Sequence, residues 1–373
     1  MGGAAHGGLR IADDVSGDLL KEAARTMTLK YGLARLPVGG AKAGIVAPFD
    51  IAPDQRKALL RAFGIALRPY LESSVYVPGE DMGSSAEDIE EVMRAAGMRP
   101  LPRSLMYAAS GYYTGVGVCA AVLAAAHHLG IESSDLRVAI EGFGAVGASA
   151  ATALHDHGVR VVAVSTSKGG LHDDEGLNIP RLLELKRSLG NDIVDQPEMG
   201  TLVPREKLSS ITCDAFVPCA IMHSINMQRV PGFKARLLIP GANVPCTTDA
   251  ERVLTERGVI VVPDFVSNCG GVLGSSISRA GLPEAEVASI VARRVGEEVA
   301  TLLTETASSK RSLRALATER SMERFTISKD GFERPSMVGR VFRCGVGLHR
   351  RGLVPRPLMA PVARWYFDRR WNS

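Results

Sequence analysis

The chain has 373 residues, of which 46% are hydrophobic and 23% charged, and its formal net charge is +4. This length and composition can bury the cores of two domains, which excludes a largely disordered protein. The charge excess is small, and much of it comes from arginines near the C-terminus. Nucleic-acid binding therefore has no general electrostatic basis.

The six cysteines are scattered without Cys-x-x-Cys spacing, which argues against a metal site and against a disulfide framework. The first residues lack a basic segment followed by an apolar run. The apolar stretch at residues 116–126 is too short to cross a bilayer. We therefore expect a cytoplasmic protein without a metal or a membrane attachment.

The first 110 residues predict an α/β unit. In chain order we expect a helix over residues 15–35, a loop at 39–40, a strand near 45–46, a helix over 53–70 and a strand from 74 that leads to Asp81. Ser84-x-x-Glu87 has the pattern of a capping box, which predicts the start of another helix. Glu80 and Asp88 are expected in solvent.

Lys42 is the most informative residue of this region because it lies within Gly39-Gly40-Ala41-Lys42-Ala43-Gly44. Crowding by backbone and a second cation, Lys30, would both lower the pKa of its ammonium. Such a lysine can act as an acid or a base near neutral pH. Asp81 is placed like a site residue, in a loop just ahead of a helix. Taken alone, Lys30 would be an ordinary solvated helix lysine.

Residues 114–272 predict a doubly wound parallel sheet. An alanine-rich helix is followed by apolar segments that helices and loops separate, at residues 138–140, 159–164, 215–217, 237–239 and 259–262. Ligands of such sheets bind at the carboxyl ends of the strands, where Ala220, Asn243 and Asn268 fall. The two asparagines could hold a nicotinamide ribose or carboxamide, or each could close a turn.

A Gly-x-Gly-x-x-Gly motif follows the first of these strands and opens a helical stretch that runs to His157. Gly142 could merely turn the chain, and Gly147 could merely let a helix pack on a strand. The strand before and the helix after favour a dinucleotide-binding turn. We therefore expect its six residues to bind a cofactor: Gly142, Phe143, Gly144, Ala145, Val146 and Gly147.

Together these motifs resemble the glutamate/leucine/phenylalanine/valine dehydrogenase family, whose members interconvert an amino acid with its 2-oxo acid and ammonia using a nicotinamide. The resemblance runs from about residue 2 to about residue 276. It includes residues 7–10, 27–30, 114–118, 241–243 and 263–272.

The resemblance implies an α/β fold in two domains. It implies a substrate domain over residues 1–110, a Rossmann domain that binds NAD(P) over 111–282, and a helix over 283–307 that returns to the first domain. Residues 308–373 stay unassigned. It also implies a homo-oligomer whose partners are an amino acid, its 2-oxo acid and ammonia, with no nucleic acid and no membrane.

The resemblance also implies roles for single residues. Lys30 would bind the substrate α-carboxylate, Lys42 would polarise the carbonyl and its attacking water or ammonia, and Asp81 would shuttle the proton. Thr114 would contact the cofactor. These roles make chemical sense, because a path from imine to ketone needs charge stabilisation at the developing alkoxide and repeated proton transfer.

The choice of cofactor depends on the residues that follow the second strand. Many family members carry an aspartate at the position of Thr166, which binds the adenosine ribose of NAD and repels a 2′-phosphate. Ser165, Thr166 and Ser167 are neutral donors and Lys168 is a cation. We therefore expect NADP or NAD, with tolerance of or preference for NADP, unless Lys168 is only a solvated loop lysine.

The choice of substrate depends on His6 and Ser275. Glutamate-specific members have a lysine at the position of His6, and leucine or phenylalanine enzymes have an apolar residue there. A charged His6 would accept an acidic side chain, and a neutral one would face a polar or small side chain. It could also be a frayed terminal residue. Ser275 lies where glutamate enzymes place a hydroxyl, so we expect glutamate, with a branched-chain amino acid as the alternative.

A regulatory role is a second hypothesis. The resemblance begins almost at the substrate loop, although family members usually carry a further helix and strand before it, so we expect a shortened form. Such a chain could be a non-catalytic, nucleotide-binding subunit that regulates a longer homologue. Lys30, Lys42 and Asp81 argue against this, because a regulatory subunit has no need of buried charges that are costly to keep.

Overall fold

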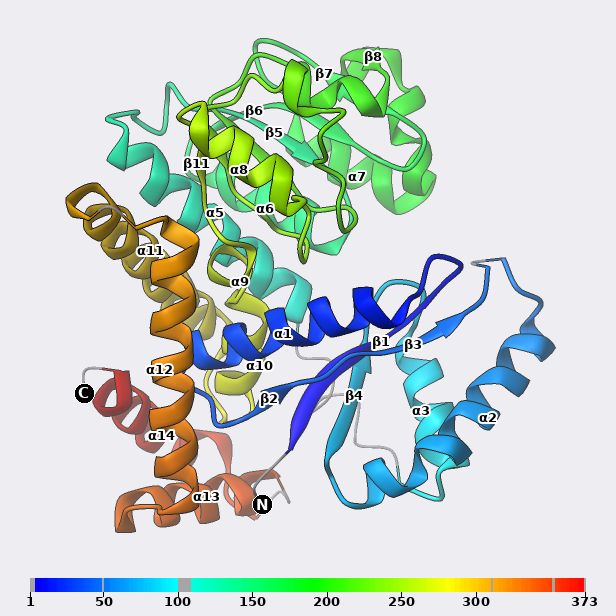
Figure 1. The fold of residues 1–373 in the computed structure, drawn as a ribbon, viewed down its shortest axis with the longest axis vertical. Coiled ribbons are helices and arrows are strands. Elements are labelled where there is room, and N and C mark those ends of the chain that lie inside the picture. The colour runs from blue at the N-terminus through cyan, green and yellow to red at the C-terminus, as the bar shows by residue number, and fades with distance from the viewer. Residues whose placement is uncertain (1–3, 49, 100–108, 310, 351–352, 372–373) are drawn as a thin grey trace. The chain divides into compact units, whose positions relative to one another are not determined.

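The computed structural model describes residues 4–48, 50–99, 109–309, 311–350 and 353–371 (Figure 1). The chain forms two compact units. Unit 1 comprises Met1–Ala108, Ser275–Leu282 and Arg320–Ser373, and unit 2 comprises Ala109–Gly274 and Pro283–Glu319. This division differs from the expected domain boundaries. Residues 275–282 fall in unit 1, and the helix α11 (Glu284–Ser308), expected to return to the first domain, falls in unit 2.

Unit 1 is built on a parallel sheet of four strands, with β1 (Ala5–Ala12) paired to the other three: β2 (Gly39–Gly40), β3 (Ala43–Val46) and β4 (Tyr76–Glu80). The strands β2 and β3 pair with β1 in one continuous register, since Ala5 lies opposite Gly39 and Leu9 opposite Ala43. Neither β1 nor β2 was predicted. Their glycines permit close approach, because a Cβ at Gly7 would lie 1.6 Å from the Ala41 carbonyl oxygen.

Helices cover both faces of this sheet. On one face, α2 (Pro53–Glu72) and α3 (Ala86–Ala95) pack over a core that includes Leu9, Ile11 and Ile89. On the other face lies α1 (Gly17–Leu33), against Gly44 of β3 (Figure 1). The predicted helices over residues 15–35 and 53–70 are confirmed.

The start of α3 corrects the predicted capping box by one residue. The N-cap is Ser85, whose hydroxyl accepts from the amide of Asp88, and the Asp88 carboxylate accepts from the Ser85 amide at 2.7 Å. Ser84 instead accepts a hydrogen bond from the Asp81 amide at 3.0 Å, so it belongs to the loop. Asp88 was expected in solvent but is buried and pairs with Arg56 at 2.6 Å. Glu80 is exposed, as predicted.

Unit 2 contains a sheet of seven strands in the order β11-β10-β9-β5-β6-β7-β8. The first five in this order are parallel and confirm the five predicted strands: β5 (Arg137–Glu141), β6 (Arg160–Ser165), β9 (Ala215–Pro218), β10 (Leu237–Leu238) and β11 (Ile260–Val261). The antiparallel strands β7 (Gly170–His172) and β8 (Thr201–Val203) were not predicted. The chain order reverses on either side of β5, which is where doubly wound sheets bind ligands.

The helices of unit 2 pack on this sheet and on one another. They are α5 (Ser110–His128), α6 (Ala145–Asp156), α7 (Ile179–Leu189), α8 (Thr248–Glu256), α9 (Asp264–Ser267) and α11, with α10 (Gly270–Ser278) starting in this unit. Short 3₁₀ helices lie at Gly190–Asp195, Pro197–Met199, Arg205–Ser210 and Val230–Gly232. The helix α5 packs against both α6 and α11, which confirms the predicted helices there.

The C-terminal segment left unassigned by the sequence is helical. It consists of α12 (Leu313–Glu333), α13 (Met337–Arg350) and α14 (Arg356–Trp371). A Cβ at Gly32 of α1 would lie 2.1 Å from the Ser321 carbonyl oxygen, so α12 and α1 approach closely. Arg356 donates to the carbonyl of Gly281 at 2.9 Å. Among the described residues, no helix is both long and apolar enough to cross a membrane.

Candidate active site and dinucleotide site

Lys42 lies in the two-residue gap between β2 and β3, which both pair with β1. The gap contains Ala41 and Lys42, and the Ala41 amide donates to the His6 carbonyl at 2.9 Å. The unbroken register places this step beside Gly7 and Gly8 of β1. The side chain of Lys42 is only 4% exposed. The sheet therefore fixes a lysine that has almost no contact with water, as the glycine loop predicted.

Asp81 is the ionic partner of Lys42, at 2.8 Å between Nζ and Oδ2. A Cβ at Gly8 would lie 2.7 Å from the Asp81 Cβ, so only glycine lets β1 pass the pair. The Asp81 side chain is 20% exposed. One partner is thus buried and the other reaches solvent, which is an arrangement suited to proton exchange with water.

Lys30 is the second buried lysine of unit 1. It lies in the last turn of α1 and is 5% exposed. The same helix is tied to the loop of Lys42, because the Gly40 amide donates to the Thr28 hydroxyl at 3.0 Å. Lysines are rarely buried, since the ammonium is strongly hydrated. Two buried lysines therefore lie on segments that a hydrogen bond joins.

His6 belongs to the same unit and is neutral at physiological pH. Burial and the nearby cation of Arg279 lower its pKa to about 4. Its ring contacts Tyr31 edge to face, at 6.0 Å between centroids. Of the two roles expected for His6, the neutral one fits this geometry.

Arg279 was missed by the sequence analysis. Burial raises the pKa of Tyr31 to about 12, and the Arg279 cation opposes that rise. The same cation acts on His6, so Arg279 lies near both rings. It lies in the turn that follows α10, four residues after Ser275. It stood in none of the motifs that the sequence analysis used.

The glycine turn of unit 2 has the geometry expected of a dinucleotide site. Gly142 has φ +95°, which favours glycine, and a Cβ there would lie 3.0 Å from Ala220. A Cβ at Gly147 would lie 1.8 Å from the Gly142 carbonyl oxygen, so α6 packs directly on the turn. The Gly142 amide donates to the Ser165 hydroxyl at 3.0 Å. All these contacts fix the end of β5 against the start of α6.

The first turn of α6 is open to an anion. Its N-cap is Gly144, which provides no side-chain cap and has open space on its Cβ side. The uncapped amides and the helix dipole favour a phosphate there. Ala145 is exposed and Val146 half-buried, whereas the Phe143 ring is buried beside Lys186. Phe143 can therefore offer only its backbone to a ligand.

The residues after β6 are more constrained than the sequence suggested. Ser165 and Thr166 are buried. The Thr166 hydroxyl donates to the Asn191 carbonyl at 2.8 Å and accepts from the Lys168 amide. The Lys168 ammonium forms an ion pair with Asp192. The carboxylate absent at Thr166 is therefore supplied next to Lys168 by Asp192, which the sequence analysis missed.

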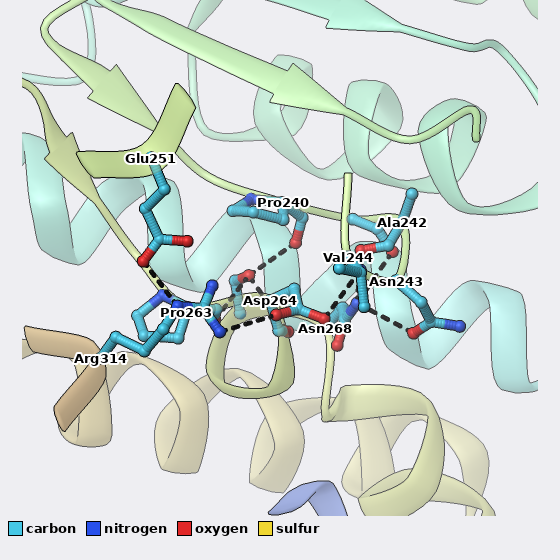
Figure 2. Close-up of polar contacts among 11 residues, drawn as sticks. Pro240, Ala242, Asn243, Val244, Glu251, Pro263, Asp264, Asn268 and Arg314 are labelled. Carbon is cyan, nitrogen blue, oxygen red and sulfur yellow. Dashed lines mark hydrogen bonds and ion pairs between the residues drawn. The ribbon is translucent and has the colours of Figure 1, made fainter. Parts of the chain in front are cut away.

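Asn268 organises the loop that carries Asn243 (Figure 2). Its Nδ2 donates to the carbonyls of Ala242 at 2.8 Å and Gly241 at 3.3 Å, and lies 3.4 Å from Asn243 Oδ1. Asn268 is 2% exposed, and its Oδ1 has no hydrogen-bond partner among the described residues. The amide nitrogen thus fastens the loop, and the amide oxygen is a buried acceptor.

Arg314 forms the second support of this loop (Figure 2). Val244 has φ +44°, and its amide donates to the Asp264 carboxylate at 2.9 Å. Arg314 lies 3.5 Å from that carboxylate and 2.5 Å from Glu251. The strained residue next to Asn243 is therefore held by an acid that is itself held by Arg314. The sequence analysis named neither Arg314 nor this acid as a site residue.

Thr114 lies at the start of α5, beside the glycine pair that begins α10. Its hydroxyl donates to the Ser110 carbonyl at 2.7 Å, and a Cβ at Gly271 would lie 2.4 Å from that hydroxyl. Thr114 thus lines a tight helix junction in unit 2. Ser275 lies in α10 and is half-buried.

A doubly wound sheet with this glycine turn, joined in one chain to a unit with a buried lysine–aspartate pair, defines a dinucleotide-binding protein of the dehydrogenase class. A family model described as "Glutamate/Leucine/Phenylalanine/Valine dehydrogenase" matches residues 109–326. A second, described as "Glu/Leu/Phe/Val dehydrogenase, dimerisation domain", matches residues 1–98. The chain belongs to the glutamate/leucine/phenylalanine/valine dehydrogenase family.

Individual relatives point the same way. The chain is 34% identical over 285 residues to an NADP-specific glutamate dehydrogenase of Saccharolobus shibatae, covering 73% of this chain and 66% of that protein. It is 30% identical over 290 residues to the catabolic NAD-specific glutamate dehydrogenase of Bacillus subtilis, covering 72% and 66%. The match thus spans slightly less than two thirds of each relative. The hetero-hexameric glutamate dehydrogenase of Thermus thermophilus, in a leucine-bound form, has a TM-score of 0.74 at 25% identity, covering 88% and 82%.

Proposed function

We propose that the chain is an amino-acid dehydrogenase that catalyses the reversible oxidative deamination of an L-amino acid, with glutamate as its substrate, using NADP or NAD. The observation that carries the proposal is the buried Lys42 with its partner Asp81 at 2.8 Å. Burying an ion pair costs desolvation free energy, so its presence here favours a functional role. A lysine that faces a carboxylate can stabilise an oxyanion and exchange protons. Family membership supports the same chemistry.

The proposed mechanism assigns proton and charge work to the two residues. A bound nicotinamide would accept the hydride from the substrate Cα, after the substrate ammonium has lost a proton to solvent, and the substrate would become an iminium. Water would add to the iminium carbon while Asp81 takes a proton from the water, which gives a carbinolamine. Asp81 would pass this proton to the carbinolamine nitrogen. Asp81 would then take the hydroxyl proton as ammonia leaves and the carbon–oxygen double bond of the 2-oxo acid forms, with the Lys42 ammonium stabilising the charge that develops on the oxygen. Asp81 would finally release its proton to solvent.

Lys30 would hold the substrate α-carboxylate. Its burial makes an ammonium–carboxylate hydrogen bond stronger than the same contact in water. The Thr28 contact with the Gly40 amide would keep this lysine in register with the Lys42 loop. Binding the carboxylate at one lysine would orient the reacting carbon towards the other.

We expect Arg279 to supply the positive charge for a glutamate side chain. His6 is neutral, and Arg279 is the cation that acts on both His6 and Tyr31. Replacing Arg279 by methionine should raise the KM for glutamate by about 10- to 100-fold, which is the usual effect of losing one charge-assisted hydrogen bond. The KM for leucine should change little. Steady-state kinetics on both substrates check this, with His6→Gln as a control that keeps a neutral side chain.

Equal losses for glutamate and leucine in Arg279→Met would instead mean that Arg279 only supports the fold. Glutamate affinity in the parent protein should also show no titration near pH 6.5, because the His6 pKa of about 4 keeps the ring neutral above pH 5. A KM that rises as pH increases through 6.5 would show that a protonated His6 binds the substrate.

We expect the pair of Lys168 and Asp192 to set the cofactor preference. Asp192 neutralises Lys168 and places a carboxylate beside it. Replacing Asp192 by asparagine should raise kcat/KM for NADP relative to NAD by about tenfold, because Lys168 is then released to meet a 2′-phosphate. Lys168→Gln should shift the ratio the other way. Kinetics with both cofactors measure it, and an unchanged ratio in both variants would place the ribose elsewhere.

The first domain matches a dimerisation domain, and a structure of similar fold is hetero-hexameric. We propose that the chain works as a homo-oligomer in the cytoplasm, with small-molecule partners only.

The first experiment measures reduction of NAD and of NADP by the purified protein across a panel of L-amino acids. Activity on glutamate supports the proposal, and activity confined to leucine or valine supports the branched-chain alternative. A protein that binds dinucleotide yet reduces none of it would contradict the catalytic proposal. Mixing it with a longer homologue would then test whether it regulates that partner.

A further inference from the structure

A cavity lies in unit 1, and its lining includes neither Lys42 nor Asp81. Its volume is about 890 Å³, and it is lined by residues 35–37, which follow α1, by Ser276 of α10, and by residues 320–369 of the three C-terminal helices and the segments between them. Most of its lining comes from residues 327–369, which lie outside the ranges that the family models match. A volume of this size is typical of a small-molecule site. The family chemistry assigns nothing to this cavity.

The lining is strongly cationic. One acid, Glu323, faces an excess of guanidinium groups contributed by four separate segments of the chain: Arg35, Arg320, Arg324, Arg343 and Arg369. Five arginines and one acid give this lining a net positive charge, which attracts an anion.

The cavity also has apolar and aromatic walls. The Phe342 ring is stacked on Tyr366 at 3.7 Å between centroids, and the Arg343 guanidinium lies 4.6 Å from the Phe332 ring centroid. Arg343 is held in place by the carbonyls of Phe332 and Gly339, both at 3.3 Å. Its side chain is therefore preorganised, which lowers the entropic cost of binding a ligand.

We propose that this cavity binds an organic phosphate, that is, a phosphate monoester with a compact apolar or aromatic body. A phosphate carries about two negative charges and three acceptor oxygens, so several guanidiniums can bind it at once. A carboxylate offers one charge and two oxygens and matches this excess of arginine less well. The aromatic walls would receive the apolar body.

The place of the cavity gives the ligand a structural consequence. The segment 35–37 directly follows α1, and α1 carries Lys30 and is pressed against α12 at Gly32. An occupant would join the end of α1 to the three C-terminal helices. Binding should therefore raise the melting temperature of the protein as well as fill the cavity.

The test uses calorimetric titration of the whole protein with phenyl phosphate. Inorganic phosphate, phenol and benzoate serve as comparison probes, because they carry the phosphate alone, the ring alone, and the ring with a carboxylate. Phenyl phosphate should bind at least about tenfold more tightly than each of the three.

Two double variants locate the site. R324Q/R369Q removes two charges from the lining. R334Q/R340Q removes two charges from exposed residues of the same region that do not line the cavity. The lining variant should weaken phenyl phosphate binding by at least about tenfold, and the matched variant should leave it unchanged. Circular dichroism checks that both variants keep the parent helix content.

Each other outcome overturns a part of the proposal. Equal binding of benzoate would exclude the phosphate, and equal binding of inorganic phosphate would exclude a role for the aromatic walls. Equal weakening in the two double variants would mean that only net charge matters. Binding is measured directly, so an inactive enzyme would leave this test intact.

Discussion

Replacing Lys42 by methionine is expected to lower kcat for amino-acid oxidation by about two to three orders of magnitude, which is the scale on which removal of an oxyanion-stabilising donor acts. Methionine has a similar length and no charge, so it fits a site that is 4% exposed. It removes the donor that would stabilise the developing oxygen charge. Steady-state kinetics with glutamate and the preferred cofactor measure the loss, and dinucleotide binding should stay at the parent level.

Two further variants separate chemistry from folding. Lys42→Arg keeps the charge but changes the donor geometry, so it should recover the parent melting temperature and only part of the rate. Asp81→Asn keeps the size and removes the base, so its kcat should fall while its melting temperature stays near that of the parent. A Lys42→Met enzyme that keeps more than about a tenth of the parent kcat would exclude Lys42 from the chemistry.

Periodicity and glycine spacing predicted the helices and the five parallel strands of unit 2, because burial on both faces makes such strands continuously apolar. Strand β1 was missed because Gly7 and Gly8 carry no strand propensity. Glycine is required at these two positions because Ala41 and Asp81 approach them closely in the folded sheet. A contact between segments over thirty residues apart leaves no local signal in one sequence.

The same reason limited the prediction of the site. Lys42 and Asp81 each stood in a recognisable loop, and the sheet brings them to 2.8 Å. Asp192 and Arg279 act through partners that are distant in sequence or in another element, so neither lay in a recognisable motif. The capping box moved by one residue because Ser84 was already engaged by the Asp81 amide. Local sequence patterns predicted which loops carry candidate site residues. Tertiary contacts decided which atoms of these loops form hydrogen bonds or ion pairs within the protein.

Arg314 supports the Asn243 loop through partners that are distant in sequence, and its removal should destabilise the protein. Arg314→Met leaves the buried Asp264 carboxylate without its cation. Breaking a fully buried pair costs about 3–5 kcal/mol, but the Arg314 side chain is 39% exposed, so we expect a loss of about 2 kcal/mol in the free energy of unfolding. Denaturant unfolding measures it. Arg311→Met is the matched control, because its pair with Glu319 is exposed and should contribute less than about 0.5 kcal/mol.

The double variant R314M/D264N decides whether the lost stability comes from the stranded charge. Asparagine is neutral and can still accept from the Val244 amide, so the double variant should recover more than half of the lost stability. The cofactor loop would nevertheless stay less firmly held, so we expect the KM for the dinucleotide to rise by about three- to tenfold in both variants while kcat changes less. A KM that follows stability in both variants would show that Arg314 only supports the fold. A raised KM in the stability-restored double variant would show that Arg314 positions the Asn243 loop for the cofactor.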